Sequence, residues 1–211
     1  MKTLTLEQLR EFDSTAGADI VYHGTSSSYS EQIESRGWPL DGHPFDWADV
    51  DFVCEMAVKF NIYGEWWVGS GLARKNRGAS FTGRLATAIT YAEKCPGGES
   101  LHSTIEGARK ISSHLRSQGD NHSECDRLEK LVAEWQPHVD YSAPVVYAVC
   151  GTSDVFPEMF RYYQHLAQGK DGIDVDNLIL EAVATCDVPA HAIVSRTALT
   201  KPQPIPSIHA L

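Results

Sequence analysis

The chain has 211 residues, of which 42% are hydrophobic and 22% charged, a balance typical of a folded globular domain rather than a disordered or fibrous chain. Its formal net charge of −10, from 28 acidic and 18 basic residues, works against the extended phosphate neutralisation on which dedicated DNA-binding domains depend. No apolar run approaches the ~18 residues of a membrane span, and the N-terminus lacks the apolar stretch of a signal peptide. We therefore expect one soluble, cytoplasmic domain over residues 1–211 with no membrane partner; delivery into another cell stays open.

The first third of the chain predicts a strand–turn–helix unit behind an N-terminal helix. Apolar side chains at helical spacing predict that helix within residues 1–16. Residues 19–23 are typical of a short strand, which we expect to stop at Gly24. Three consecutive serines then offer N-caps for a helix over residues 29–36, which a glycine ends.

The middle of the chain predicts mainly helices. Residues 38–78 mix aromatics with turn formers, and we expect only one helix there, near residues 50–60. A short strand at residues 79–82 leads into a helix over residues 85–94. Helical spacing then returns on both sides of a Gly-Asp-Asn break, which predicts a helical hairpin inserted at about residues 99–138.

The last third predicts strands again. Residues 145–150 form an apolar, β-branched run, which we expect to be a buried central strand. After a helix at residues 157–166, a second apolar strand covers residues 178–184 and a last short one residues 192–194. Residues 200–211 contain three prolines and should form an extended tail.

The five cysteines are scattered and include no C-x-x-C pair, which indicates a reducing compartment. His114, His122 and Cys125 are imaginable metal ligands, but their spacing crosses the predicted turn and no fourth ligand is apparent. We therefore expect these three to be surface residues and no metal to be bound.

Polar side chains stand where the predicted core would favour apolar ones. His23 ends a strand, Ser80 and Tyr91 bracket a strand–helix unit, and Glu181 interrupts an apolar strand. A carboxylate in a buried strand costs several kcal/mol unless it is paired or faces a cleft. Glu181 is therefore the strongest functional candidate on physical grounds.

These segments resemble the three motifs of the ADP-ribosyltransferase superfamily, in the branch that holds diphtheria toxin and the poly(ADP-ribose) polymerases. The stretch Tyr22-His23-Gly24-Thr25 resembles the first motif, residues 79–92 the second, and the strand with Glu181 the third. The order and spacing of the motifs are similar to those of the family. The resemblance implies an α+β fold in which two small, mostly antiparallel sheets form an NAD⁺ cleft, with flanking helices and the inserted hairpin.

The resemblance also implies a role for each motif. His23 would hydrogen-bond ribose hydroxyls of NAD⁺, and Gly24 would let the backbone approach the nicotinamide carboxamide. Tyr91 would stack on the nicotinamide ring, and Glu181 would stabilise the charge that develops as the glycosidic bond breaks. The implied catalytic residues are His23, Tyr91 and Glu181. The implied NAD⁺-binding residues are Tyr22, His23, Gly24, Thr25, Ser80, Phe81, Arg84 and Tyr91.

The acceptor of the ADP-ribose stays open. Ser80 stands where this branch usually has a tyrosine and is similar to the serine of the arginine-modifying branch, whereas Ile179 replaces the acidic or amide residue of that branch. A basic cluster could neutralise the NAD⁺ pyrophosphate or guide a nucleic acid. That cluster consists of Arg74, Lys75, Arg77 and Arg84.

We therefore expect a mono-ADP-ribosyltransferase that uses NAD⁺ as co-substrate and modifies a protein or nucleic acid, in the manner of a bacterial toxin or defence effector. An antitoxin or inhibitor protein is an open partner. One alternative is a transferase specialised for nucleic acid, or an RNA 2′-phosphotransferase of the related fold. Another is a binding module that keeps the fold without turnover, which Ser80 in place of tyrosine favours.

Overall fold

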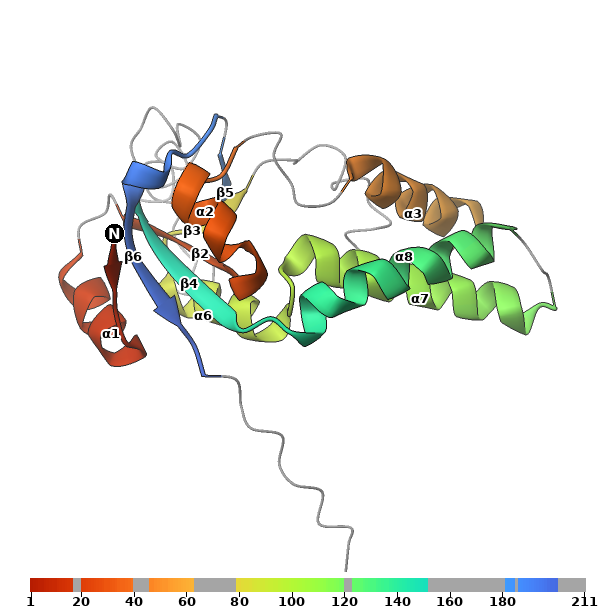
Figure 1. The fold of residues 1–211 in the computed structure, drawn as a ribbon, viewed down its shortest axis with the longest axis horizontal. Coiled ribbons are helices and arrows are strands. Elements are labelled where there is room, and N and C mark those ends of the chain that lie inside the picture. Colours follow the sequence, from red (N-terminus) through yellow and green to blue (C-terminus); the bar gives the residue numbers. More distant parts are fainter. Residues whose placement is uncertain are drawn as a thin grey trace, which may run out of the picture.

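A computed structural model describes residues 1–16, 20–39, 46–62, 79–119, 123–151, 181–184 and 186–200. In this part of the chain, helices cover both faces of one six-stranded sheet, so the fold is α+β (Figure 1). No helix there is both long and apolar enough to cross a membrane. The helix expected at 157–166, the tail from 201 and three members of the basic cluster, Arg74, Lys75 and Arg77, lie outside the described residues.

The sheet has the strand order β1-β6-β4-β2-β3-β5. All neighbouring strands are antiparallel except β1 and β6, which are parallel. The expectation of two sheets is not met by the described strands, because β4 pairs with β2 on one side and with β6 on the other. The strands are β1 Lys2–Thr3, β2 Ile20–Ser26, β3 Ser80–Thr82, β4 Pro144–Cys150, β5 Glu181–Val183 and β6 Ile193–Ala198.

Strand β4 confirms the predicted buried central strand. Its residues from Val145 to Val149 are 0% exposed, including the large side chain of Tyr147. A strand that is covered on both faces needs apolar residues at every position rather than at alternate ones, and this run of valines, tyrosine and alanine meets that need.

Strand β2 does not stop at Gly24, as the sequence predicted, but continues to Ser26. It stays paired with β4 through Gly24, Thr25 and Ser26. A Cβ atom on Gly24 would lie 1.9 Å from the backbone oxygen of Ala88, so the glycine permits close packing of a helix on the strand rather than a chain reversal.

The helices follow the sequence closely. The helix after β3 has the predicted bounds, and the first helix begins with a capping box between Thr5 and Gln8. A 3₁₀ turn at Ser27–Tyr29 precedes the helix that Gly37 ends with a φ of 80°. The α-helices are α1 Leu6–Thr15, α2 Ser30–Arg36, α3 Trp47–Lys59, α6 Leu85–Lys94, α7 Glu99–Ser117 and α8 Ser123–Asp140.

The inserted hairpin, α7 and α8, packs with α3 around a separate hydrophobic core. These three helices extend beyond one end of the sheet (Figure 1). The prediction that Cys125 lies at the surface is wrong: its side chain is 0% exposed in this core, because it lies on the apolar face of α8 with Leu128 and Leu131. A cysteine that packs there behaves as a small hydrophobic residue.

The two faces of the sheet have different coverings. One face contributes Val21, Phe81 and Tyr147 to a core closed by Ile33 of α2 and by Trp38. The other face packs against α1 and α6 through a second set of side chains: Leu9, Tyr22, Leu85, Ala88, Val146 and Ala148. Adjacent residues of β2 therefore serve opposite faces, as the two-residue period of a strand requires.

Candidate functional site

The three motif segments, distant in sequence, lie on neighbouring strands. Tyr22 of β2 is in register with Thr82 of β3, and Thr82 is in register with Glu181 of β5. The first motif, the strand of the second motif and the residue singled out in the third motif thus form one row across the sheet. Only β3 separates β2 from β5 in the strand order.

His23 lies one residue beyond this row and is held by the second motif. Its Nδ1–H donates to the backbone carbonyl of Ser80, 2.7 Å away. Because a carbonyl oxygen only accepts, Nδ1 must carry the proton, so in the neutral ring Nε2 is the acceptor. The ring of His23 also contacts the rings of Trp38 and Phe81, with centroids 5.3 and 5.2 Å away. The imidazole is therefore fixed in both tautomer and orientation.

Gly24 lies directly against the backbone of α6. A Cβ at this position would meet three backbone atoms of α6, the carbon and oxygen of Ala88 and the nitrogen of Ala92. Helix α6 also carries Tyr91, so the missing side chain of Gly24 sets how near Tyr91 lies to β2. In the structure this glycine serves helix packing, a role that the family resemblance did not imply.

Tyr22 and Phe81 are both 1% exposed. The hydroxyl of Tyr22 donates to Asp13 Oδ1 of α1 at 2.6 Å, on the side of the sheet that faces α1 and α6. Burial, followed by the bond to Asp13, raises the pKa of Tyr22 above its ordinary value. Contacts of these two residues with a ligand would therefore come from their backbones.

The remaining predicted residues surround the start and end of α6. Arg84 precedes this helix, and its backbone N–H donates to the hydroxyl of Thr82. Tyr91 lies in the last turn and is partly buried, whereas Ser80 is exposed. Thr25 is buried and lines a cavity of about 190 Å³ at the end of β2. That volume is smaller than the roughly 300 Å³ at which ligand pockets usually begin, so the cavity does not by itself accommodate a dinucleotide.

Two contacts at this site had no sequence signal strong enough to predict them. Trp38 follows the glycine that ends α2, and its backbone forms a bridge with Val188 that places the indole ring beside His23. Asp13 lies in an amphipathic helix whose exposed residues are mostly polar, so nothing distinguished it as the partner of Tyr22. Both contacts join segments that are distant in sequence or lie on different elements.

Comparison with models of known protein families, with characterised proteins and with solved structures found no significant match to the chain. Within the described ranges, no group of three or more histidine, cysteine, aspartate or glutamate side chains is placed to hold a metal ion. The case for a function therefore depends on the geometry of the motif residues.

Proposed function

We propose that this protein is a mono-ADP-ribosyltransferase of the ADP-ribosyltransferase fold, which transfers ADP-ribose from NAD⁺ to a macromolecular acceptor and releases nicotinamide. The observation that carries the proposal is the row of Tyr22, Thr82 and Glu181 across β2, β3 and β5. Residues from three separate motifs meet there, in the order in which the motifs occur in the chain.

The state of His23 supports the proposed role in binding NAD⁺. With Nδ1–H donating to the Ser80 carbonyl, Nε2 is the acceptor atom of the neutral ring, and a ribose hydroxyl is a donor of the kind that such a nitrogen binds. The ring packs against two aromatic side chains that also contact each other, so little rotational freedom is lost when a ligand binds. This preorganisation is typical of a residue that positions a substrate.

The proposed reaction breaks the bond between C1′ of the ribose and N1 of nicotinamide. The bonding electron pair leaves with nicotinamide, and the ribose develops oxocarbenium character. Glu181 supplies a negative charge that stabilises this state more than the ground state, and Tyr91 stacks on the nicotinamide ring. A nucleophilic atom of the acceptor then attacks C1′ and gives up its proton.

The proposal is tested with NAD⁺ labelled on its adenylate phosphate, incubated with the purified protein and a cell lysate. The Glu181→Gln variant serves as the matched control, and nicotinamide release is measured in parallel. We expect label on macromolecules only with the native protein, and its removal by protease or by nuclease identifies the acceptor class. If the native protein produces no label and releases no nicotinamide, the proposed transferase activity is overturned in favour of a binding module.

A further inference from the structure

The cavity at the end of β2 lies where the inserted hairpin joins the sheet. Its walls come from β2, from the end of α6 and the following turn, and from the start of β4. With a volume of about 190 Å³, it has room for one side chain rather than for a nucleotide. Its polar lining side chains are those of Thr25, Ser26, Glu93 and Ser142.

Glu93 is the one charged residue among those that line this cavity; Lys94, the next residue of α6, is exposed and is not part of the lining. Helix α6 ends at Lys94, and Ala92 and Glu93 of its last turn line the cavity. The last carbonyls of a helix have no following turn to satisfy them and carry about half a negative charge in total. The exposed carboxylate of Glu93 adds a full charge at the same end, and the chain as a whole has a net charge of −10. A cationic group is favoured there over an anion.

The polar side chains of the cavity are hydroxyls with lone pairs to offer. Thr25, Ser26 and Ser142 are 4%, 2% and 2% exposed. The Ser142 hydroxyl donates its hydrogen to the carbonyl of Val139, so both lone pairs of the Ser142 oxygen can still accept hydrogen bonds. The Ser26 oxygen accepts one bond from the N–H of Ser28 and can accept a second. Buried acceptors beside a carboxylate complement the N–H donors of an ammonium or guanidinium group.

We infer that this cavity binds a basic side chain, lysine or arginine, of a partner protein. The apolar walls from Ala92, Pro96 and Pro144 suit the methylene stem of such a side chain, while Glu93 and the hydroxyls take its charged end. Thr25 follows His23 by two residues of the same strand, which is about 7 Å. If the proposed function holds, the partner is the acceptor, and the cavity anchors it beside the NAD⁺ site.

The inference is tested by binding, without NAD⁺ and without turnover. The probe is the capped peptide acetyl-Gly-Arg-Gly-amide, titrated into the ¹⁵N-labelled full chain and followed by NMR. The same peptide with citrulline in place of arginine is the ligand control, because citrulline has a similar shape and no charge. We expect saturable shifts of the backbone amides of Thr25, Gly97 and Ser142 with the arginine peptide only.

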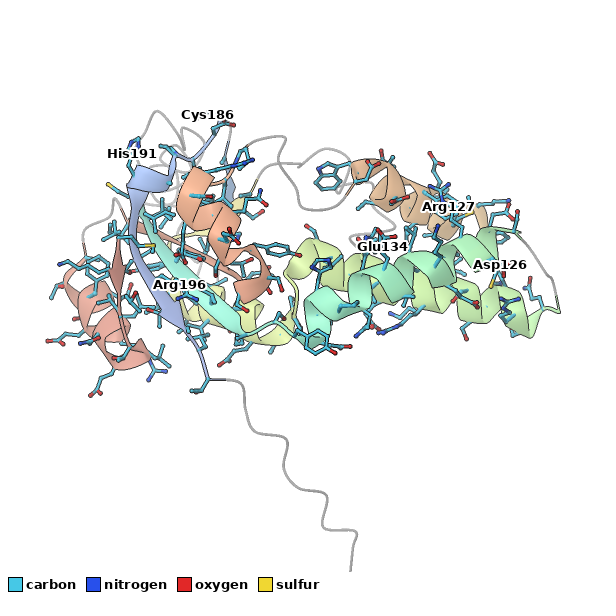
Figure 2. All side chains as sticks on the ribbon, in the orientation of Figure 1. Asp126, Arg127, Glu134, Cys186, His191 and Arg196 are labelled. Atoms are coloured by element: carbon cyan, nitrogen blue, oxygen red, sulfur yellow. The ribbon has the colours of Figure 1, made fainter. Side chains whose placement is uncertain are left out.

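A matched pair of variants assigns the binding to this cavity. Glu93→Gln should weaken binding about fivefold, the upper range for one exposed charge pair. Glu134→Gln removes the same charge from the exposed surface of α8, where Figure 2 labels Glu134, and should leave affinity unchanged. The inference is overturned if the citrulline peptide binds as tightly as the arginine peptide, or if the arginine peptide causes no saturable shift. It is also overturned if Glu93→Gln binds the arginine peptide as tightly as the native protein does. Binding without nicotinamide release would leave the cavity as a docking site and remove only the proposed transferase activity.

Discussion

Gly24 of β2 lies against Ala88 of α6 so closely that a Cβ on the glycine would stand 1.9 Å from the Ala88 oxygen. The obstructing atoms belong to backbone, so they cannot rotate away as a flexible side chain would. This contact joins the first motif to the helix of the second, and it makes the spacing between β2 and α6 sensitive to a single methyl group.

Gly24→Ala should therefore destabilise the fold by about 3 kcal/mol, at the upper end of overpacking costs in protein cores. For a chain of this size that corresponds to a fall in Tm of roughly 6–12 °C, measured by thermal unfolding. The control is Gly119→Ala, where no atom lies within 4 Å and only a φ of 76° opposes the methyl group. A loss at Gly24 no larger than at Gly119 would contradict the close packing of α6.

Tyr22→Phe tests the anchoring of β2 to α1. The substitution keeps the buried ring and removes only the 2.6 Å hydrogen bond to Asp13. We expect a loss of about 1 kcal/mol, or roughly 2–4 °C in Tm. Tyr141→Phe is the matched control, because Tyr141 is 86% exposed and its hydroxyl should contribute nothing measurable. Equal unfolding temperatures of the two variants would show that the bond to Asp13 adds no stability.

His23→Ala tests the proposed contact with NAD⁺. Loss of one hydrogen bond from a fixed imidazole should raise the Kd of NAD⁺ about tenfold, which isothermal titration calorimetry measures. His191→Ala, at an exposed histidine of the 3₁₀ turn before β6 that Figure 2 labels, should bind as the native protein does. An unchanged Kd in His23→Ala removes His23 from the proposed site.

Glu181→Gln should reduce nicotinamide release by about a hundredfold or more while the Kd of NAD⁺ stays nearly constant, because in the proposed reaction the carboxylate would act mainly on the charge of the transition state. Turnover and binding are measured on the same preparation. Glu31→Gln, at an exposed position of α2, is the control for the change in net charge. Equal losses in binding and turnover would assign Glu181 to substrate binding instead.

The stability that the contact between α3 and the hairpin contributes to the fold should depend on pH. The hydrogen bond from the backbone N–H of Glu124 itself, followed by that from Lys59 Nζ at 3.0 Å, lowers the pKa of Glu124 from 4.5 to about 2. A carboxyl with a lowered pKa in the folded state contributes stability above the unfolded pKa, and this is lost as the pH falls toward 2. NMR titration should find the Glu124 midpoint near 2 in the native protein and higher in Lys59→Met. An identical midpoint in both proteins would exclude the ion pair as a cause.

The sequence predicted the elements whose signals are local. Helix α6 has the bounds that its apolar spacing and the following Pro-Gly-Gly indicate, and the apolar run of β4 identified it as a buried strand. The capping serines and Gly37 placed α2 within one residue. These features could be predicted because periodicity, caps and breakers act within a few residues of the chain.

Other features could be decided only by tertiary contacts. Strand β1 has two residues and no pattern of its own, and it exists because it pairs with β6. A glycine commonly interrupts a strand, and only the approach of α6 explains why β2 passes through Gly24. The single continuous sheet likewise depends on β4 pairing on both of its edges.

For the candidate site, the sequence by itself determined which residue types occur in which order, and hence the resemblance to ADP-ribosyltransferases. Only the tertiary structure decided that Tyr22, Thr82 and Glu181 share a row, and that Ser80 fixes the tautomer of His23. The physical reason is that strand register and side-chain hydrogen bonds join residues more than fifty positions apart. No local preference of the chain specifies such pairs, and they become favourable only when the whole sheet is assembled.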